Sequence, residues 1–219
     1  MLTYKQIIEN KEVMTYVGRA DETIKELGYT EHSFAHVGSV TQMVKYILET
    51  LGFSERMVEL GMIAAHMHDI GNMLNREDHA QTSAIIAFNM LRDMGAEPDE
   101  ITEICTAISN HDEGTAVPAT PLAAALIIAD KADVRRSRVR NNMLFSFDIH
   151  DRVNYSVTDS SLSIDDLKQK ITLTLSIDTK YCTVMEYFEI FLGRMNLCQK
   201  AAKKLNLQFG LVINGQKMI

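Results

Sequence analysis

The chain has 219 residues, 46% of them hydrophobic and 23% charged, a balance typical of a folded globular protein rather than a disordered one. The formal net charge of −7 excludes a general attraction to nucleic acid or to anionic membranes, so we expect neither as a partner. The sequence holds no apolar run of the ~20 residues that a membrane-spanning helix needs, and its charged, amphipathic beginning is not a signal peptide. Three scattered cysteines without CxxC spacing fit a reducing compartment, so a cytoplasmic location is expected.

Helical periodicity dominates the first two thirds of the chain. It predicts helices over residues 3–27, 31–51, 55–69, 80–94, 98–110 and 122–134. Gly28 and Gly95 follow two of these segments, Ser54 precedes the third, and Pro98 lies in the first turn of the fifth, as helix termini require. An all-helical bundle is therefore expected here.

The pattern changes near Phe147, where alternation of apolar and polar residues begins. We expect a turn at residues 159–161 and a helix over residues 183–205. Strands are predicted at residues 152–157, 161–164, 171–177 and 208–213. The sequence thus predicts a mainly α-helical protein. Its expected parts are an all-helical domain over residues 1–146 and a small α+β domain of unknown role over residues 147–219.

The most unusual stretch is Ala-Ala-His-Met-His-Asp-Ile-Gly-Asn at residues 64–72, where an apolar helix carries two imidazoles and a carboxylate into its last turn. Gly71 is expected to end this helix. Burial of His68 beside Asp69 costs free energy unless a partner compensates, and a divalent metal ion is the usual partner. His66 faces nearly the opposite side and is expected to be a core histidine.

Other segments supply side chains of the same kind. His32 and His36 lie four residues apart and are predicted to share one face of their helix. His79 begins one predicted helix, and His111 ends another. Asp130 lies in an apolar helix, where a carboxylate needs a partner.

Taken in order, these residues resemble the HD superfamily of metal-dependent phosphohydrolases, over roughly residues 31–140. That family has a helix-borne His, a later His-Asp doublet and a distal Asp within an all-helical bundle. The matching positions here, including two histidines typical of the bimetallic members, are His36, His68-Asp69, Asp130, His79 and His111. The chain lacks the Gly-Tyr-Pro motif of members that hydrolyse cyclic di-GMP, and its short spacings look more like those of hydrolases of dinucleoside polyphosphates.

The resemblance implies two divalent metal ions, with Asp69 placed to bridge them. The implied ligands are His36, His68, Asp69, His79, His111 and Asp130. Mixed histidine and carboxylate ligands suit iron or manganese and also allow zinc, cobalt or nickel. An activated water would then cleave a phosphoester or phosphoanhydride of a small phosphorylated substrate, which we interpret as a nucleotide. Besides Asp69, the expected catalytic residues are His32, as a further ligand or an acid near the leaving group, and Lys131, as a point charge.

The basic run after Asp130 is predicted to bind the substrate phosphate through Lys131, Arg135 and Arg138. Arg135 and Arg138 are expected to share a helical face and to clamp phosphate together. A solvated helix end is the alternative interpretation of this run. Two other functions stay open: an HD-type di-iron oxygenase, which uses the same ligands, and a nucleotide-binding regulatory module. The sequence also leaves open whether the protein is a homodimer.

Overall fold

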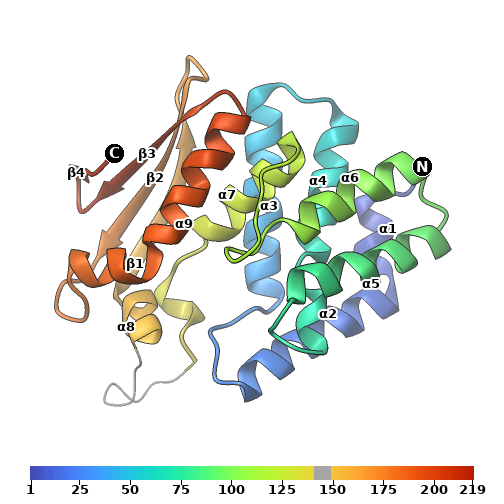
Figure 1. The fold of residues 1–219 in the computed structure, drawn as a ribbon, viewed down its shortest axis with the longest axis horizontal. Helices are drawn as coiled ribbons and strands as arrows, with labels where there is room; N and C mark the ends of the chain where they lie inside the picture. Colours follow the sequence, from blue (N-terminus) through green and yellow to red (C-terminus); the bar gives the residue numbers. More distant parts are fainter. Residues whose placement is uncertain (141–148) are drawn as a thin grey trace.

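Figure 1 shows the computed structural model, which describes residues 1–140 and 149–219. The predicted fold class is confirmed: helices make up most of the described chain, and a small four-stranded sheet lies near the C-terminus. None of the helices in the described ranges is long and apolar enough to cross a membrane. The helical part contains α1 (Tyr4–Glu9), α2 (Lys11–Glu26), α3 (Phe34–Leu51), α4 (Glu55–Met67), the 3-10 helix η1 (Ile70–Met73), α5 (His79–Asp93), α6 (Pro98–Ser109), α7 (Pro121–Ala132) and the 3-10 helix η2 (Arg136–Arg138).

Capping side chains divide the first segments differently from the prediction. Residues 3–27 form two helices, because Asn10 is extended and its side chain accepts hydrogen bonds from the first N–H groups of α2. Ser33 caps α3 by accepting from the N–H of Ala35, so this helix begins at Phe34. His32 therefore precedes α3, and the predicted helical face shared by His32 and His36 is wrong.

The histidine-rich stretch turns at the end of α4. This helix ends at Met67, and His68 is its C-cap, so Gly71 does not end it as predicted but lies within η1. A Cβ atom at Gly71 would stand 2.4 Å from the carbonyl oxygen of His79 and 2.6 Å from the amide nitrogen of Ser83. Glycine thus allows η1 to pack directly against the first turn of α5, which carries His79.

The core is organised around α7, which packs against α3, α4, α6 and α9 (Val184–Lys204). Its residues 122–129 are all buried, as expected for a helix that is apolar on every side. α7 ends at Ala132, and Arg135 has an extended backbone, so residues 135–140 do not continue the helix.

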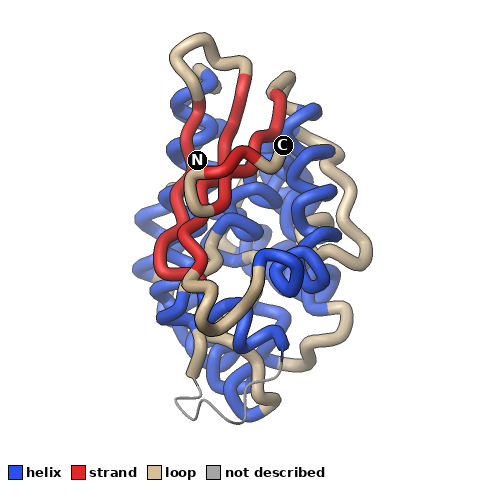
Figure 2. Tube along the Cα trace, turned by 90° about the vertical axis from the view of Figure 1, so that its left-hand side faces the viewer, coloured by secondary structure: helices blue, strands red, loops and turns tan. Residues whose placement is uncertain are grey.

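The C-terminal strands form one sheet in the order β1-β2-β3-β4. β1 (Val157–Ile164) pairs antiparallel with β2 (Lys170–Ile177), and β2 pairs parallel with β3 (Gln208–Ile213). The parallel pair is joined through α9, as a parallel connection requires, and β4 (Gln216–Lys217) completes the sheet. α9 packs against both β3 and α7, and Figures 1 and 2 show the strands gathered on one side of the helices. The sheet is thereby attached to the helical bundle through a buried helix.

Two local predictions in the C-terminal part are wrong. Residues 152–157 were expected to form a strand, but α8 (Ile149–Ser156) occupies most of them. Val153 and Val157 are four residues apart, a spacing that suits a helix as well as alternation, and the Asn154 amide donates to the His150 carbonyl. The turn expected at residues 159–161 lies within β1, just after a register shift between Val157 and Asp159. The predicted domain boundary at residues 146/147 lies outside the described residues.

Candidate metal centre

Four buried histidines from four parts of the bundle direct the Nε2 atoms of their rings toward a common centre. The carbonyl oxygens of Ala65, Arg76 and Ile108 contact the Nδ1 atoms of His68, His79 and His111 at 2.7, 3.0 and 2.7 Å. The fourth contact joins His36 Nδ1 to Asp133 Oδ2 at 2.7 Å. Because these oxygens can only accept, each Nδ1 carries a proton, and the neutral form of each ring presents its Nε2 lone pair to the centre.

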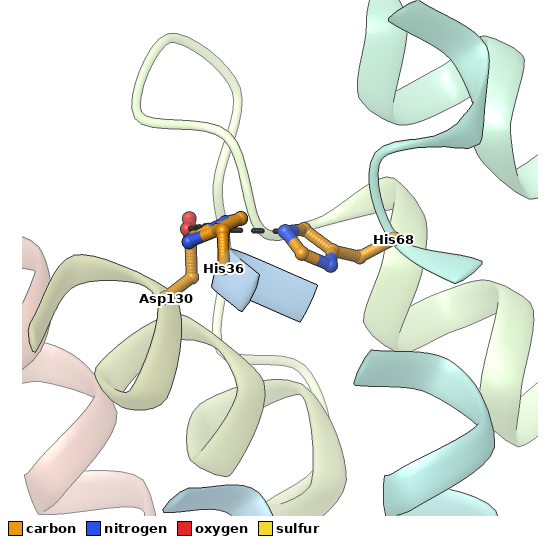
Figure 3. A group of neighbouring side chains, drawn as sticks. All are labelled: His36, His68 and Asp130. Atoms are coloured by element: carbon orange, nitrogen blue, oxygen red, sulfur yellow. Dashed lines mark ion pairs between the residues drawn. The ribbon is translucent and has the colours of Figure 1, made fainter. Parts of the chain in front are cut away.

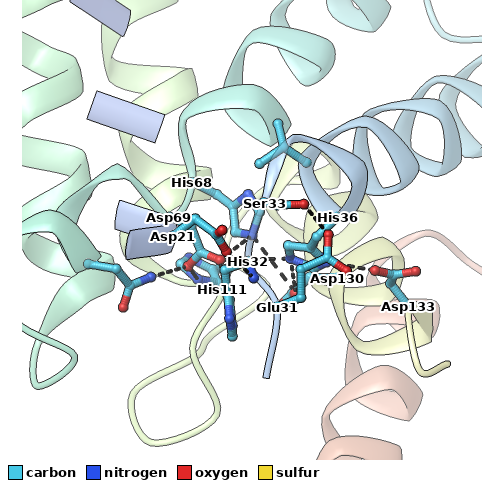
Figure 4. Close-up of polar contacts among 12 residues, drawn as sticks. Asp21, Glu31, His32, Ser33, His36, His68, Asp69, His111, Asp130 and Asp133 are labelled. Atoms are coloured by element: carbon cyan, nitrogen blue, oxygen red, sulfur yellow. Dashed lines mark hydrogen bonds and ion pairs between the residues drawn. The ribbon is translucent and has the colours of Figure 1, made fainter. Parts of the chain in front are cut away.

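Asp69 lies among these rings, and Figure 4 shows it beside His36, His68 and His111. Its Oδ2 atom lies 3.2 Å from Nε2 of His68 and 3.7 Å from Nε2 of His36. Its Oδ1 atom lies 3.4 Å from Nε2 of His79 and 3.6 Å from Nε2 of His111. The two oxygens of one carboxylate therefore face two different sets of imidazoles, as a bridging ligand would.

Asp130 joins the first of these sets from the end of α7. Its Oδ1 atom lies 3.4 Å from Nε2 of His36 and 3.8 Å from Nε2 of His68, and Figure 3 shows the three side chains pointing toward one another. The other oxygen accepts a hydrogen bond from Lys131 Nζ at 2.7 Å. Among the described residues, two groups could hold a metal ion: His36, His68 and Asp130, and His68, Asp69 and His111.

The bonding at this centre is incomplete without a cation. Nε2 of His36 and Nε2 of His68 are buried and have no hydrogen-bond partner within residues 1–140 and 149–219. A buried polar atom left unpaired costs about 1–3 kcal/mol. Lone pairs of neutral imidazoles beside two carboxylates are the ligand set that divalent transition metals bind, so the residues fit such an ion.

The electrostatics keep most of these groups in the form that binds metal. Burial lowers the pKa of His79 to about 4 and that of His32 well below its usual range. Burial raises the pKa of Asp69, but His68 and His111 outweigh it, and the pKa falls well below the usual range. For His68 burial lowers the pKa, yet Asp69 and Asp130 raise it overall. The carboxylates thus attract positive charge to the position of His68 Nε2.

Asp133 is a site residue that the sequence did not reveal. Besides holding His36, it accepts hydrogen bonds from Ser39 Oγ at 3.1 Å and Arg135 Nε at 2.9 Å. It therefore fixes the ring orientation and tautomer of His36, although it does not face the centre itself. The sequence feature that could have indicated Asp133 is its position three residues after Asp130, at the end of the same helix.

The structure places the remaining candidates unequally. His32 lies at the edge of the centre, with Nε2 3.9 Å from Asp69 Oδ2 and Nδ1 2.8 Å from the Thr30 carbonyl. Arg138 reaches the same region but donates to the carbonyls of Glu31 and Asp133. Arg135 bonds to Asp133 and to Ser137 instead, because the helix that would have aligned it with Arg138 ends earlier. His66 lies apart, 3.5 Å from the Tyr4 hydroxyl.

A pocket of about 270 Å³ opens above the centre, and both Asp69 and Asp130 line it. Its wall also includes residues of α8 and α9, so the C-terminal part contributes to it. Four cationic side chains line it: Arg76, Lys131, Arg138 and Arg194. Arg194 is distant from the motifs in sequence, and Arg76 lies in the segment between Asp69 and His79, where it belongs to no motif.

The chain is similar to several known proteins. An uncharacterized protein of Methanocaldococcus jannaschii is 27% identical over 191 residues, which cover 77% of this chain and 71% of that protein. A crystal structure of a protein described as a predicted HD superfamily hydrolase, from an uncultured Thermotogales bacterium, matches with a TM-score of 0.45 and 23% identity, covering 61% of this chain and 75% of that one. The family model of the HD domain matches residues 33–135, the segment that holds His36, the His68-Asp69 doublet and Asp130. Residues 33–135 of the chain therefore match the HD domain.

Proposed function

We propose that this protein is a metal-dependent phosphohydrolase that cleaves a phosphoester or phosphoanhydride of a small, nucleotide-type substrate. The observation that carries the proposal is the buried meeting of four Nε2 atoms with Asp69 and Asp130, in which Nε2 of His36 and of His68 has no partner in the described ranges. His36, His68 and Asp130 would hold one ion, and Asp69, His79 and His111 would hold a second. When bound, the ions would make water nucleophilic at neutral pH and neutralise charge on the phosphoryl oxygens.

The residues around the centre support an anionic substrate. Lys131 Nζ is held between Asp130, at 2.7 Å, and Glu113, at 3.4 Å, so its charge has a fixed position beside a proposed ligand. Arg76 and Arg138 line the same pocket. A phosphoryl group with developing negative charge is stabilised by such fixed cations.

His32 suits proton acceptance better than proton donation. Its Nδ1 donates to the Thr30 carbonyl, so the neutral ring offers only the lone pair of Nε2. Burial keeps its pKa low, and the ring is therefore neutral at pH 7. We infer that His32 acts as an additional ligand or a proton acceptor, and not as the acid near the leaving group.

Metal analysis followed by a substrate screen tests the proposal. Protein purified without oxygen should contain about two transition-metal ions per chain, iron or manganese by preference, with zinc, cobalt and nickel as alternatives. The metal-loaded protein should release phosphate from at least one member of a panel of nucleotides, cyclic dinucleotides and dinucleoside polyphosphates. Oxygen uptake without phosphate release would favour the oxygenase instead, and an inactive, fully loaded protein would contradict both.

The variant Asp69→Ala tests the ligand assignment independently. Asp69 is the carboxylate that faces both sets of imidazoles, so the variant should lose metal and turnover together while its far-ultraviolet circular dichroism stays helical. An unchanged metal content in this variant would refute the assignment.

A further inference from the structure

The C-terminal part of the chain supplies one wall of the pocket through Arg194, on α9. The guanidinium of Arg194 is held by two contacts: its Nε forms an ion pair with Glu113, and its central carbon lies 4.2 Å above the ring of Phe191. Glu113 belongs to the loop between α6 and α7, so this ion pair joins the HD domain to α9. Contacts on an edge and on a face fix the plane of the guanidinium.

A line of alternating charges connects Arg194 to the proposed metal centre. Glu113 Oε1, which contacts Arg194, also lies 3.4 Å from Lys131 Nζ, and Lys131 Nζ in turn lies 2.7 Å from Asp130 Oδ2. Lys131 is thus neutralised on both sides, by one carboxylate toward the centre and one toward α9. Arg194 is the outer end of the line and has Glu113 on one side alone.

Arg194 makes fewer hydrogen bonds to the described residues than the other pocket arginines do. Arg138 donates to two carbonyl groups, and Arg76 donates to the Asn72 side chain and contacts Asp112. Within the part of the chain that the structure describes, the Nη groups of Arg194 make no hydrogen bond, and 26% of this side chain is exposed. Its two outer nitrogens can therefore bind an anion in the fork geometry that suits phosphate.

We propose that Arg194 binds a second phosphate group of the substrate, so that the C-terminal part completes the active site. The inference rests on the proposed phosphohydrolase function, because that function places the first phosphoryl group at the metal centre. It narrows the substrate class to small molecules with at least two phosphates, such as nucleoside diphosphates or triphosphates. A pocket of about 270 Å³ is near the lower limit of ligand sites, which argues against enclosing a whole dinucleotide.

Isothermal titration calorimetry with phosphonates tests this assignment without turnover. The probes are methylphosphonate, with one anionic group, and the methylene analogues of pyrophosphate and tripolyphosphate, whose P–C–P links resist hydrolysis. They are titrated into the full-length protein loaded with Mn²⁺ and freed of excess metal. Arg194→Ala should weaken the affinity for at least one of the two longer analogues about tenfold, since a charge-assisted bidentate contact is lost. The affinity for methylphosphonate should change less than about twofold. The affinity of Arg194→Lys for the longer analogues should lie between those of Arg194→Ala and wild type, because lysine keeps the positive charge but lacks the forked guanidinium.

Arg152→Ala is the matched control. Arg152 lies on α8, pairs with Glu186 and does not line the pocket, so its loss should leave all three affinities unchanged. Equal weakening of all probes by Arg194→Ala, or no weakening of either longer analogue, would overturn the proposal. If Arg194→Ala fails to fold, the same affinities are compared between Arg194→Lys and wild type, and they test the proposal in the same way. If Arg194→Ala weakens binding of a longer analogue but not of methylphosphonate, and the protein hydrolyses no substrate, the phosphohydrolase proposal is rejected. The anion site at Arg194 is then still supported.

Discussion

Asp133 illustrates how a residue outside the proposed ligand set controls one inside it. Its carboxylate orients His36 through a 2.7 Å contact with Nδ1, and it is held in turn by Ser39 and Arg135. Asp133→Ala should therefore weaken metal binding by about 10–100-fold, measured by competition with a chromophoric chelator. Ser39→Ala is the control, because it removes a bond to Asp133 and leaves the contact with His36. An Asp133→Ala variant with wild-type affinity would contradict the role.

The ion pair of Arg56 with Glu100 is predicted to make stability depend on pH at the far side of the bundle. Hydrogen bonds from Arg56 lower the pKa of Glu100 below its ordinary value of 4.5, in spite of a small opposing effect of burial. A carboxylate with a depressed pKa stabilises the folded state above the unfolded pKa, and this stabilisation is lost as the pH falls through the folded pKa. Wild type should therefore lose stability between about pH 5 and pH 3.

Arg56→Met should remove part of that pH dependence. At pH 7 we expect a loss of about 1 kcal/mol in urea denaturation, since the pair is near the surface and screened by solvent. At pH 3 the difference from wild type should shrink. The control Arg19→Met breaks a pair with Glu22 in which both side chains are more than half exposed, and it should change stability by less than about 0.5 kcal/mol. An Arg56→Met effect that is equal at both pH values would contradict the assignment.

At the scale of elements, alanine substitutions at Gly71 and at Gly38 are expected to change the stability of the protein in opposite directions. Ala at position 71 would place its Cβ within 2.6 Å of backbone atoms of α5, which cannot move aside as a flexible side chain can. Gly71→Ala should therefore destabilise the protein by about 3 kcal/mol and weaken metal binding, because η1 directly follows the His68-Asp69 doublet and packs against the first turn of α5, which carries His79. Thermal unfolding should show a lower Tm for this variant than for wild type.

Gly38 lies within α3, and a Cβ atom added at this position would have no atom of another residue within 4 Å, leaving out its chain neighbours and the backbone of its own helix. Gly38→Ala should raise stability by about 0.5–1 kcal/mol through helix propensity. Equal effects of the two substitutions would show that crowding at η1 is not what constrains Gly71.

For the whole molecule, the proposed ions join α3, α4, α5, α6 and α7 at one point. A ligand present at 100 times its dissociation constant stabilises the folded state by about 2.7 kcal/mol. For a chain of this length that corresponds to a rise in Tm of roughly 5–10 °C. Chelation should lower Tm by this amount, and restoring Mn²⁺ should reverse the loss. Asp69→Ala should show no response to either treatment, and a wild-type Tm indifferent to chelator would count against the metal centre.

The sequence by itself determined the helical class, the elements with long periodic patterns and the order of the metal-ligand candidates. These features depend on local spacing: His68-Asp69 at the end of an apolar helix and Asp130 within another are visible without the fold. Where a short segment satisfied two periods at once, as with Val153 and Val157, the sequence could not decide, because packing against α9 selects the helix.

Only the tertiary structure decided which residues surround the centre. Asp133 became visible through its contact with His36, 97 residues away, and Arg194 through the packing of α9 on α7. Arg135 and Arg138 were separated because α7 ends at Ala132, and a change in backbone direction redirects every side chain after it. Ligand types and their order are written in local sequence, whereas orientation, tautomer and the far wall of the pocket arise from contacts between distant segments, which no local pattern encodes.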